Sequence, residues 1–189
     1  WSEKYDSTDT PIEPEAIVKI FNELIDEDHV IVLDAGNNRA WFTRLLQTNR
    51  IKQVYGAGGV AAMAYGPSAS IAAAMIKPEK KIVCIAGDSS FMMTPYVLHT
   101  AKMHDLPISY VILNDSAYGN VRDVLSRKGR PISLNPDVDF TNIADGFGVE
   151  NILVEDYKDL KSAIEKALNT KELMLVDIKI NKKSNHLRI

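Results

Sequence analysis

The sequence predicts an α/β fold: a three-layer, doubly wound, mostly parallel sheet of about six strands with helices on both faces. Two observations carry this prediction. Short runs of valine, isoleucine and leucine, such as residues 30–33 and 82–86, are apolar throughout, as expected for strands buried on both faces. These runs alternate along the chain with longer amphipathic or alanine-rich segments that are typical of helices. Such alternation favours a parallel sheet with helices packed on each side.

The same patterns place the individual elements. Strands are expected at residues 30–34, 51–55, 81–86, 108–113, 151–154 and 173–180. Helices are expected at residues 14–24, 60–76, 94–104, 116–128, 140–146 and 156–168. The small residues of 60–76 suit a helix that is packed closely on nearly all sides, and residues 129–139 form a proline-containing loop. We therefore predict a linker or leading arm at 1–14, one domain at 15–180 and a polar, solvated tail at 181–189.

Composition narrows the class of protein. The chain has 189 residues, of which 46% are hydrophobic and 25% charged, and these are ordinary values for a globular domain. A net charge of −3 disfavours nucleic acid as a partner, and no apolar run is long enough to span a membrane. The single cysteine, Cys84, predicts a buried, inert thiol and a cytoplasmic location. Because the chain starts at Trp1, we expect an excised domain or a processed piece.

Two acidic residues follow successive apolar runs. Asp88 comes after the predicted strand 81–86, and Asp115 ends the next strand 27 positions later. That spacing accommodates a loop, a helix and a strand, so neighbouring parallel strands bring both carboxylates to one edge of the sheet. Oxygen ligands of this kind suit Mg²⁺ or Ca²⁺, and Mg²⁺ keeps positions open for phosphate oxygens. The alternative is that each aspartate only caps the helix after its strand.

Small polar turns accompany these acids. Gly87 lets the backbone approach a ligand closely, and Ser89 and Ser90 offer hydroxyl and amide groups to a phosphate at a helix start. Residues 36–38, Gly-Asn-Asn, form a turn whose amides suit phosphate oxygens in the same way. Residues 56–61 also match G-x-G-x-x-A, a dinucleotide-binding pattern. However, the acid that ends the following strand lies 27 positions past this pattern instead of about 20.

Together these motifs resemble the thiamine-diphosphate-dependent enzymes. Residues 87–120 resemble the family signature, which is Gly-Asp-Gly followed further along the chain by a pair of asparagines. Residues 58–73, GGVAAMAYGPSASIAA, resemble the GGLGAMGFGLPAAIGA stretch of acetolactate synthases. Trp1, Pro11 and the turn DAGNNRAW resemble the start of that family's third domain. The resemblance covers roughly residues 1–180 and is to the C-terminal diphosphate-binding (PP) domain of an acetolactate synthase or pyruvate oxidase-like enzyme.

The resemblance implies a role for each matching residue. Mg²⁺ would be bound by the carboxylates of Asp88 and Asp115 and by the backbone carbonyl of Ala117. Met63 would hold the cofactor in a bent shape, and the carbonyl of Ala61 would accept a hydrogen bond from its amino group. The other cofactor-binding positions are Gly36, Asn37, Asn38, Gly87, Ser89, Ser90, Tyr118 and Gly119. No catalytic residue is expected in this chain, because the family's activating glutamate lies on a separate pyrimidine-binding (PYR) domain.

Three positions depart from the family pattern. Ser89 replaces the last glycine of Gly-Asp-Gly. Asp115 replaces an asparagine and so adds a negative charge beside the metal position. Val124 stands where acetolactate synthases commonly carry a tryptophan that shapes the acceptor site.

The resemblance implies an enzyme that decarboxylates or carboligates 2-oxo acids, as a homodimer or homotetramer that includes a PYR domain or subunit. With 189 residues, the chain has no room for the PYR domain or for the central domain that carries FAD in some members. We therefore expect this chain alone to bind Mg²⁺–thiamine diphosphate weakly or not at all, without turnover. Two alternatives stay open: the small subunit of a split 2-oxo acid decarboxylase, such as the sulfopyruvate type, and a non-catalytic regulatory or assembly module that has lost the cofactor.

Overall fold

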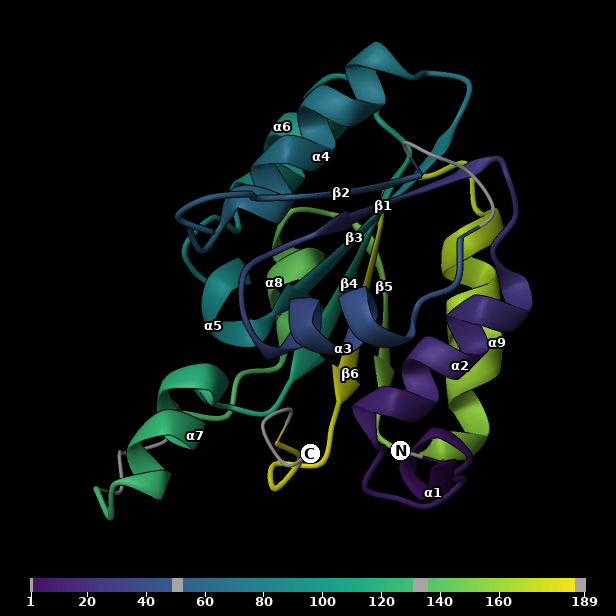
Figure 1. Ribbon diagram of the computed structural model, residues 1–189. Helices are drawn as coiled ribbons and strands as arrows, with labels where there is room; N and C mark the ends of the chain where they lie inside the picture. Colours follow the sequence, from purple (N-terminus) through teal and green to yellow (C-terminus); the bar gives the residue numbers. More distant parts are fainter. Residues whose placement is uncertain (1, 49–52, 131–135, 186–189) are drawn as a thin grey trace.

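One parallel sheet organises the molecule (Figure 1). The computed structural model describes residues 2–48, 53–130 and 136–185. The strands lie in the order β2-β1-β3-β4-β6-β5, and every pair is parallel. They are β1 (His29–Leu33), β2 (Val54–Gly56), β3 (Lys81–Gly87), β4 (Ile108–Asn114), β5 (Glu150–Val154) and β6 (Met174–Lys179). The predicted three-layer α/β fold with about six parallel strands is confirmed.

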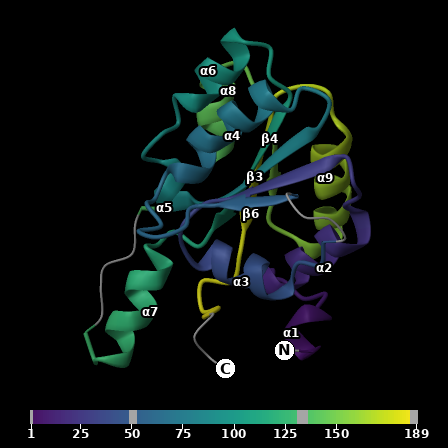
Figure 2. The same cartoon turned by 45° about the horizontal axis from the view of Figure 1, so that its top comes forward.

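Helices cover both faces of the sheet (Figure 1). One face carries α2 (Pro14–Leu24), α3 (Asn37–Leu45) and α9 (Tyr157–Asn169). The other carries α4 (Tyr65–Ile76), α5 (Asp88–Phe91), α6 (Val97–Met103) and α8 (Phe140–Gly146). A short helix, α1 (Ser2–Tyr5), precedes α2. The remaining helix, α7 (Gly119–Arg127), extends away from the body of the molecule in both ribbon views (Figures 1 and 2).

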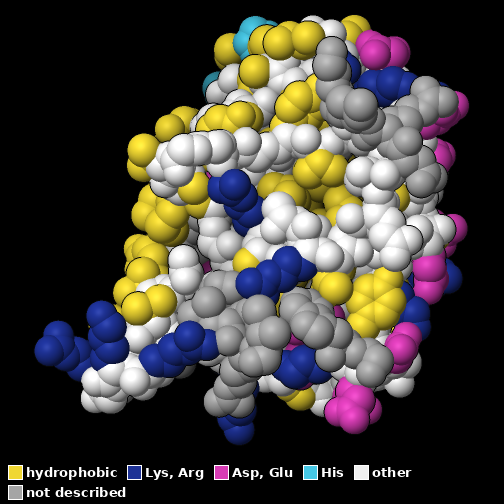
Figure 3. Space-filling model, viewed as in Figure 1, with side chains coloured by type: hydrophobic (Ala, Val, Ile, Leu, Met, Phe, Trp, Pro, Cys, Tyr) yellow, Lys and Arg dark blue, Asp and Glu magenta, His cyan; other side chains and the backbone are white. Residues whose placement is uncertain are grey.

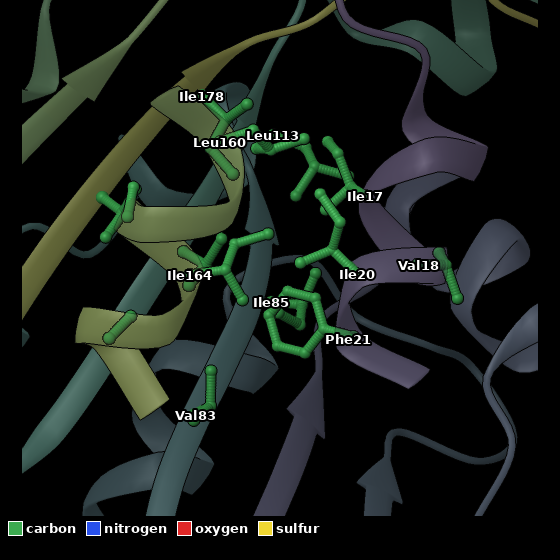
Figure 4. Packing of buried hydrophobic residues seen from close by; sticks show 14 of the residues in the cluster. Ile17, Val18, Ile20, Phe21, Val83, Ile85, Leu113, Leu160, Ile164 and Ile178 are labelled. Atoms are coloured by element: carbon green, nitrogen blue, oxygen red, sulfur yellow. The ribbon is translucent and has the colours of Figure 1, made fainter. Parts of the chain in front are cut away.

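The strands bury alternate side chains in two separate cores. Val83 and Ile85 of β3 face α2 and α9, whereas Ile82 and Cys84 face the opposite layer. In Figure 4 the apolar face of α2 points at Ile164 of α9 and at the side chains of the sheet. Each fully buried aliphatic side chain contributes about 1.5–3 kcal/mol relative to an exposed one, so these two layers hold the sheet rigid. Burial also raises the pKa of the Cys84 thiol, which is consistent with the inert cysteine expected from the sequence.

The strand order places a switch point between β1 and β3. The chain leaves β1 toward β2 on one side, and β3 pairs with β1 on the other side. The turns after β1 and β3 therefore diverge and leave a crevice at the carboxyl ends of the strands, where ligands bind in such sheets. The register pairs Leu33 with Ile85 and Gly87 with Leu113. Asp34, Asp88 and Asp115, which follow these strand ends, consequently lie at one edge of the sheet.

The predicted helix at 60–76 was wrong in its first residues. The helix begins at Tyr65, because Ala61 and Ala64 have φ angles of 53° and 66°, which a right-handed helix cannot include. The expectation of close packing on nearly all sides was also wrong. Met75 and Ile76 expose 49% and 77% of their surfaces, so one side of α4 faces solvent in this chain.

Parts of the predicted arm and of the predicted tail are buried. Ile12, in the predicted arm, is fully buried and bridges to Ile180 beside β6. The tail was expected to be solvated, but Ser184 is buried and its hydroxyl donates to Glu13. Asn181 donates to the same carboxylate at 2.7 Å. Hydrogen bonds to Glu13 therefore hold this part of the polar tail against the domain. Residues 1, 51–52, 131–135 and 186–189 of the predicted arm, strand, loop and tail lie outside the described residues.

Candidate functional site

A cavity of about 480 Å³ opens at the carboxyl edge of the sheet. Its walls come from the turns after β1, β3 and β4 and from the segment before α4. Every residue that the sequence analysis assigned to a metal or cofactor lines it: Gly36, Asn37, Asn38, Ala61, Met63, Gly87, Asp88, Ser89, Ser90, Asp115, Ala117, Tyr118 and Gly119. Segments far apart in the chain, from Ala35 to Ile180, therefore meet in one hollow, as expected at the switch point of such a fold.

Asp88 and Asp115 stand together in the wall, each only 6% exposed. Asp88 begins α5, and its Oδ2 accepts a hydrogen bond from the backbone N–H of Ala117 at 3.1 Å. Burial, and then the charge of Asp115, raise the pKa of Asp88 to about 7. Burial also raises the pKa of Asp115, although the neighbouring Arg122 acts in the opposite direction. Two buried carboxylates this close are costly to ionise together unless a cation joins them.

The chain supplies few other acidic ligands to this pair. Within the described ranges, no three His, Cys, Asp or Glu side chains are grouped so that they could hold a metal ion. An ion bound by Asp88 and Asp115 would therefore need backbone carbonyls, amide oxygens or oxygens of a ligand to complete its shell, which is how Mg²⁺ is usually held beside phosphates.

Residues 36–38, where the turn after β1 leads into α3, form another part of the wall. The Nδ2 of Asn38 donates to the carbonyls of Asp34 and Ile85, both at 3.1 Å, and so joins the diverging ends of β1 and β3. Asn37 donates from Nδ2 to the carboxylate of Asp123 at 2.9 Å. Its Oδ1 is buried and has no hydrogen-bond partner among the described residues. An acceptor left in a cavity wall in this way is available to a donor or a cation.

Asp34 holds the segment that carries Ala61 and Met63 against the cavity. Its carboxylate accepts hydrogen bonds from the backbone N–H of Gly66 at 3.0 Å and of Ala64 at 3.3 Å, and from the hydroxyl of Ser90. These bonds replace the helical ones that the left-handed residues before α4 cannot make. This role was not predicted from the sequence, although Asp34 follows a buried apolar strand in the same way as Asp88 and Asp115.

The turn after β4 packs directly on the acidic pair. The hydroxyl of Ser89 donates to the carbonyl of Ala117 at 2.9 Å, so this serine contacts one of the proposed metal ligands. Gly119 must lack a side chain, because a Cβ atom there would lie 2.9 Å from Asn37 Nδ2 and 3.0 Å from Asp115 Oδ2. Tyr118, in contrast, is 41% exposed at the rim.

Arg122 is the second residue that sequence reasoning missed. It lies on α7, and its guanidinium donates to Asp115 Oδ2 at 2.8 Å and to Asp123 Oδ1 at 2.9 Å. The side chain is only 13% exposed. A basic residue seven positions after an acid is common on protein surfaces, and nothing in the spacing alone marks this one as part of a site.

Comparison with known proteins now decides the family. Residues 34–178 match the family described as "Thiamine pyrophosphate enzyme, C-terminal TPP binding domain". The chain belongs to this family. Thiamine pyrophosphate and thiamine diphosphate are two names of one cofactor, so the resemblance stated from the motifs is confirmed. The matched range begins at Asp34 and includes the turns that line the cavity.

Relatives of this thiamine pyrophosphate domain are parts of larger chains. A probable acetolactate synthase large subunit of Methanococcus aeolicus is 27% identical over 188 residues, which are 95% of this chain and 31% of the relative. The acetolactate synthase isozyme 1 large subunit of Escherichia coli (strain K12) is 26% identical over 90% of this chain and 31% of its own length. The acetolactate synthase large subunit of Lactococcus lactis is 25% identical over 97% of this chain and 32% of its own length. The chain thus spans about a third of the curated relatives it matches.

Two further observations bear on the alternatives. The glycine-rich run at 56–61 does not open a helix as a dinucleotide fingerprint does, because α4 begins only at Tyr65. Among the described residues, no helix is both long and apolar enough to cross a bilayer.

Proposed function

We propose that this chain is the Mg²⁺–thiamine-diphosphate-binding PP domain of an acetolactate synthase-like enzyme that decarboxylates or carboligates 2-oxo acids. One observation carries the proposal: two buried carboxylates meet in a cavity of a domain that belongs to the thiamine pyrophosphate family. A divalent cation would relieve their mutual repulsion, and a diphosphate would complete its ligand shell.

The residues present fit this cofactor. Asp88 and Asp115 would bind Mg²⁺ through their carboxylates and Ala117 through its carbonyl oxygen. The unpaired Oδ1 of Asn37 gives the wall one more acceptor beside them. When bound, thiamine diphosphate supplies an electron sink for the carbon next to a carbonyl group. The protein's contribution is to hold the diphosphate end at a fixed place against the strand tips.

Glycines and small polar groups make room for the diphosphate. Gly36, Gly87 and Gly119 line the cavity without side chains, and Asn38 and Ser89 bring polar groups to it. The hydroxyl of Ser90 donates to Asp34 and accepts from the N–H of Ala64 at 2.7 Å. Ser90 therefore stabilises the wall of the cavity. Ala61, Met63 and Tyr118 lie at the more open side, where the organic rings of the cofactor would pass.

Activity requires a partner that carries a PYR domain, in a homodimer or homotetramer in the cytoplasm. Figure 3 shows hydrophobic side chains gathered along the flank of the molecule that carries α4 and α5. Exposed apolar residues there include Val60, Met63, Tyr65, Met92, Met93 and Tyr96. Such a face beside a cavity is typical of a surface covered in an assembly. FAD, if the enzyme uses it, binds in a domain outside this chain, and alone this chain binds the cofactor weakly and has no turnover.

Calorimetric titration with thiamine diphosphate, in Mg²⁺ and then in EDTA, tests the proposal. We expect weak, saturable, Mg²⁺-dependent binding to the wild-type chain and none to Asp88→Ala. Asp159→Ala serves as the matched control, because it removes an exposed aspartate on α9. Equal binding by the wild type and Asp88→Ala would refute the metal role. No binding to the wild type at millimolar ligand would instead favour a regulatory module that has lost the cofactor.

A further inference from the structure

Arg122 is held at the acidic edge by three hydrogen bonds to three segments of the chain. Besides Asp115 after β4 and Asp123 on α7, its guanidinium donates to the backbone carbonyl of Ser184 at 3.3 Å. Charge-assisted bonds of this kind are stronger and more directional than neutral ones, and the planar guanidinium suits two-point contact. The positive charge of Arg122 is therefore fixed in position instead of sampling solvent.

This fixed charge lies beside the carboxylate of Asp115, which is one of the proposed metal ligands. Arg122 binds Oδ2 of Asp115, so a metal would have to use Oδ1 of the same carboxylate or displace the guanidinium. A second cation on the same carboxylate must approach a guanidinium group a few ångströms away, in a wall that is largely closed to water. Repulsion between like charges at such short range is substantial when the effective dielectric constant is below that of water.

The same arginine also orients Asn37 through Asp123. Asp123 accepts from Arg122 on Oδ1 and from Asn37 Nδ2 on Oδ2. This second bond fixes the amide of Asn37 with its nitrogen toward the acid, and the unpaired Oδ1 is what remains. Arg122 thus contacts one proposed ligand directly and positions a possible acceptor through one intermediate residue.

We propose that Arg122 sets the affinity of this site for divalent cations: its guanidinium balances Asp115 and competes with the metal for that carboxylate. This inference rests on the proposed metal site. Arg122 is a positioning residue, since it acts through Asp115 and Asn37. It keeps the acidic edge from binding free divalent cations tightly when no diphosphate is present to add its own oxygens.

Binding of Mn²⁺ alone to the metal-free chain at pH 8, followed by the electron paramagnetic resonance signal of free Mn²⁺, tests the inference. We expect Arg122→Gln to bind Mn²⁺ about tenfold more tightly than the wild type, because a short-range repulsive charge is gone. Arg122→Lys keeps the charge and should stay within about threefold of the wild type. In an Asp115→Asn background, where the contested carboxylate is absent, Arg122→Gln should change the affinity by less than about threefold.

The outcomes separate this inference from the proposed function. Asp88-dependent Mn²⁺ binding that is equal or weaker in Arg122→Gln would overturn the role of Arg122 and leave the metal site standing. Mn²⁺ binding that is absent from both the wild type and Arg122→Gln, or that is unchanged by Asp88→Ala, would overturn both. Circular dichroism of each variant checks folding. If Arg122→Gln does not fold, Arg122→Met, which fills a similar volume with an uncharged chain, carries the same expectation. A merely structural role for Arg122 predicts looser binding, which is the opposite sign.

Discussion

Cation binding at this edge should weaken sharply in acid, because Asp88 must lose its proton before it can bind a metal. Burial and the neighbouring Asp115 raise the pKa of Asp88 to about 7. A single group with that pKa is roughly 90% ionised at pH 8 and roughly 10% at pH 6. The apparent affinity for Mg²⁺ should therefore fall about tenfold over these two pH units. Calorimetric titration of the metal-free chain at pH 6, 7 and 8 measures this directly.

The same raised pKa links Asp88 to stability. The folded chain keeps this proton up to about pH 7, whereas the unfolded chain loses it near pH 4, so the folded state binds more protons between these values. Stability therefore falls as the pH rises through this window, by about 1.4 kcal/mol per unit from this one group. Asp88→Asn does not titrate. Its free energy of unfolding, relative to the wild type, should increase by about 3 kcal/mol from pH 4 to pH 7.

Urea denaturation of both proteins across this range gives that difference. A constant difference between wild type and Asp88→Asn, together with equal Mg²⁺ affinity at pH 6 and pH 8, would refute the reasoning. Each of these two results would mean that Asp88 is already ionised in the folded, metal-free chain at pH 6. Its surroundings would then not oppose the negative charge.

Four further substitutions probe the wall and the core. Gly66→Ala should lower the free energy of unfolding in urea by about 1–3 kcal/mol or more, because its Cβ atom would lie 2.6 Å from Asp34 Cβ. Gly58→Ala is the control: its Cβ atom would meet open space, so stability should change by less than about 0.5 kcal/mol. Ser89→Ala frees the carbonyl of Ala117 and should raise Mg²⁺ affinity by up to about fivefold, the equivalent of one net hydrogen bond; a lower affinity would contradict this. Ile164→Ala should cost about 2–5 kcal/mol of stability and leave Mg²⁺ affinity unchanged, because this side chain of α9 is buried in the core between the helices and the sheet; altered affinity would show that the core and the site are coupled.

The sequence was sufficient to predict that these residues line one cavity, for a geometric reason. In a parallel sheet, all carboxyl ends of strands point to the same edge, so residues that follow apolar runs must meet there. Asp88 and Asp115 required only this rule and the positions of two strands. The lining of the cavity by Gly36, Asn37 and Asn38 follows from the same rule applied to the strand before them.

What the sequence could not predict depends on the conformation of individual turns. The helix after Gly59 starts late because Ala61 and Ala64 adopt left-handed φ angles. Alanine does not favour this conformation, so its presence in the sequence does not predict it. Asp34 stabilises that turn through a contact with Gly66, 32 positions away. The pairing of Arg122 with Asp115 depends on how α7 leaves the sheet, which local propensity does not determine.

Crystals of the chain soaked with Mn²⁺ and thiamine diphosphate give the most direct test of the central claim. The account predicts an anomalous scattering peak at the carboxyl edge of the sheet, within ligand distance of carboxylate oxygens of both Asp88 and Asp115 and of diphosphate oxygens. A peak bound elsewhere, or a cofactor bound with these two carboxylates unliganded, would contradict it.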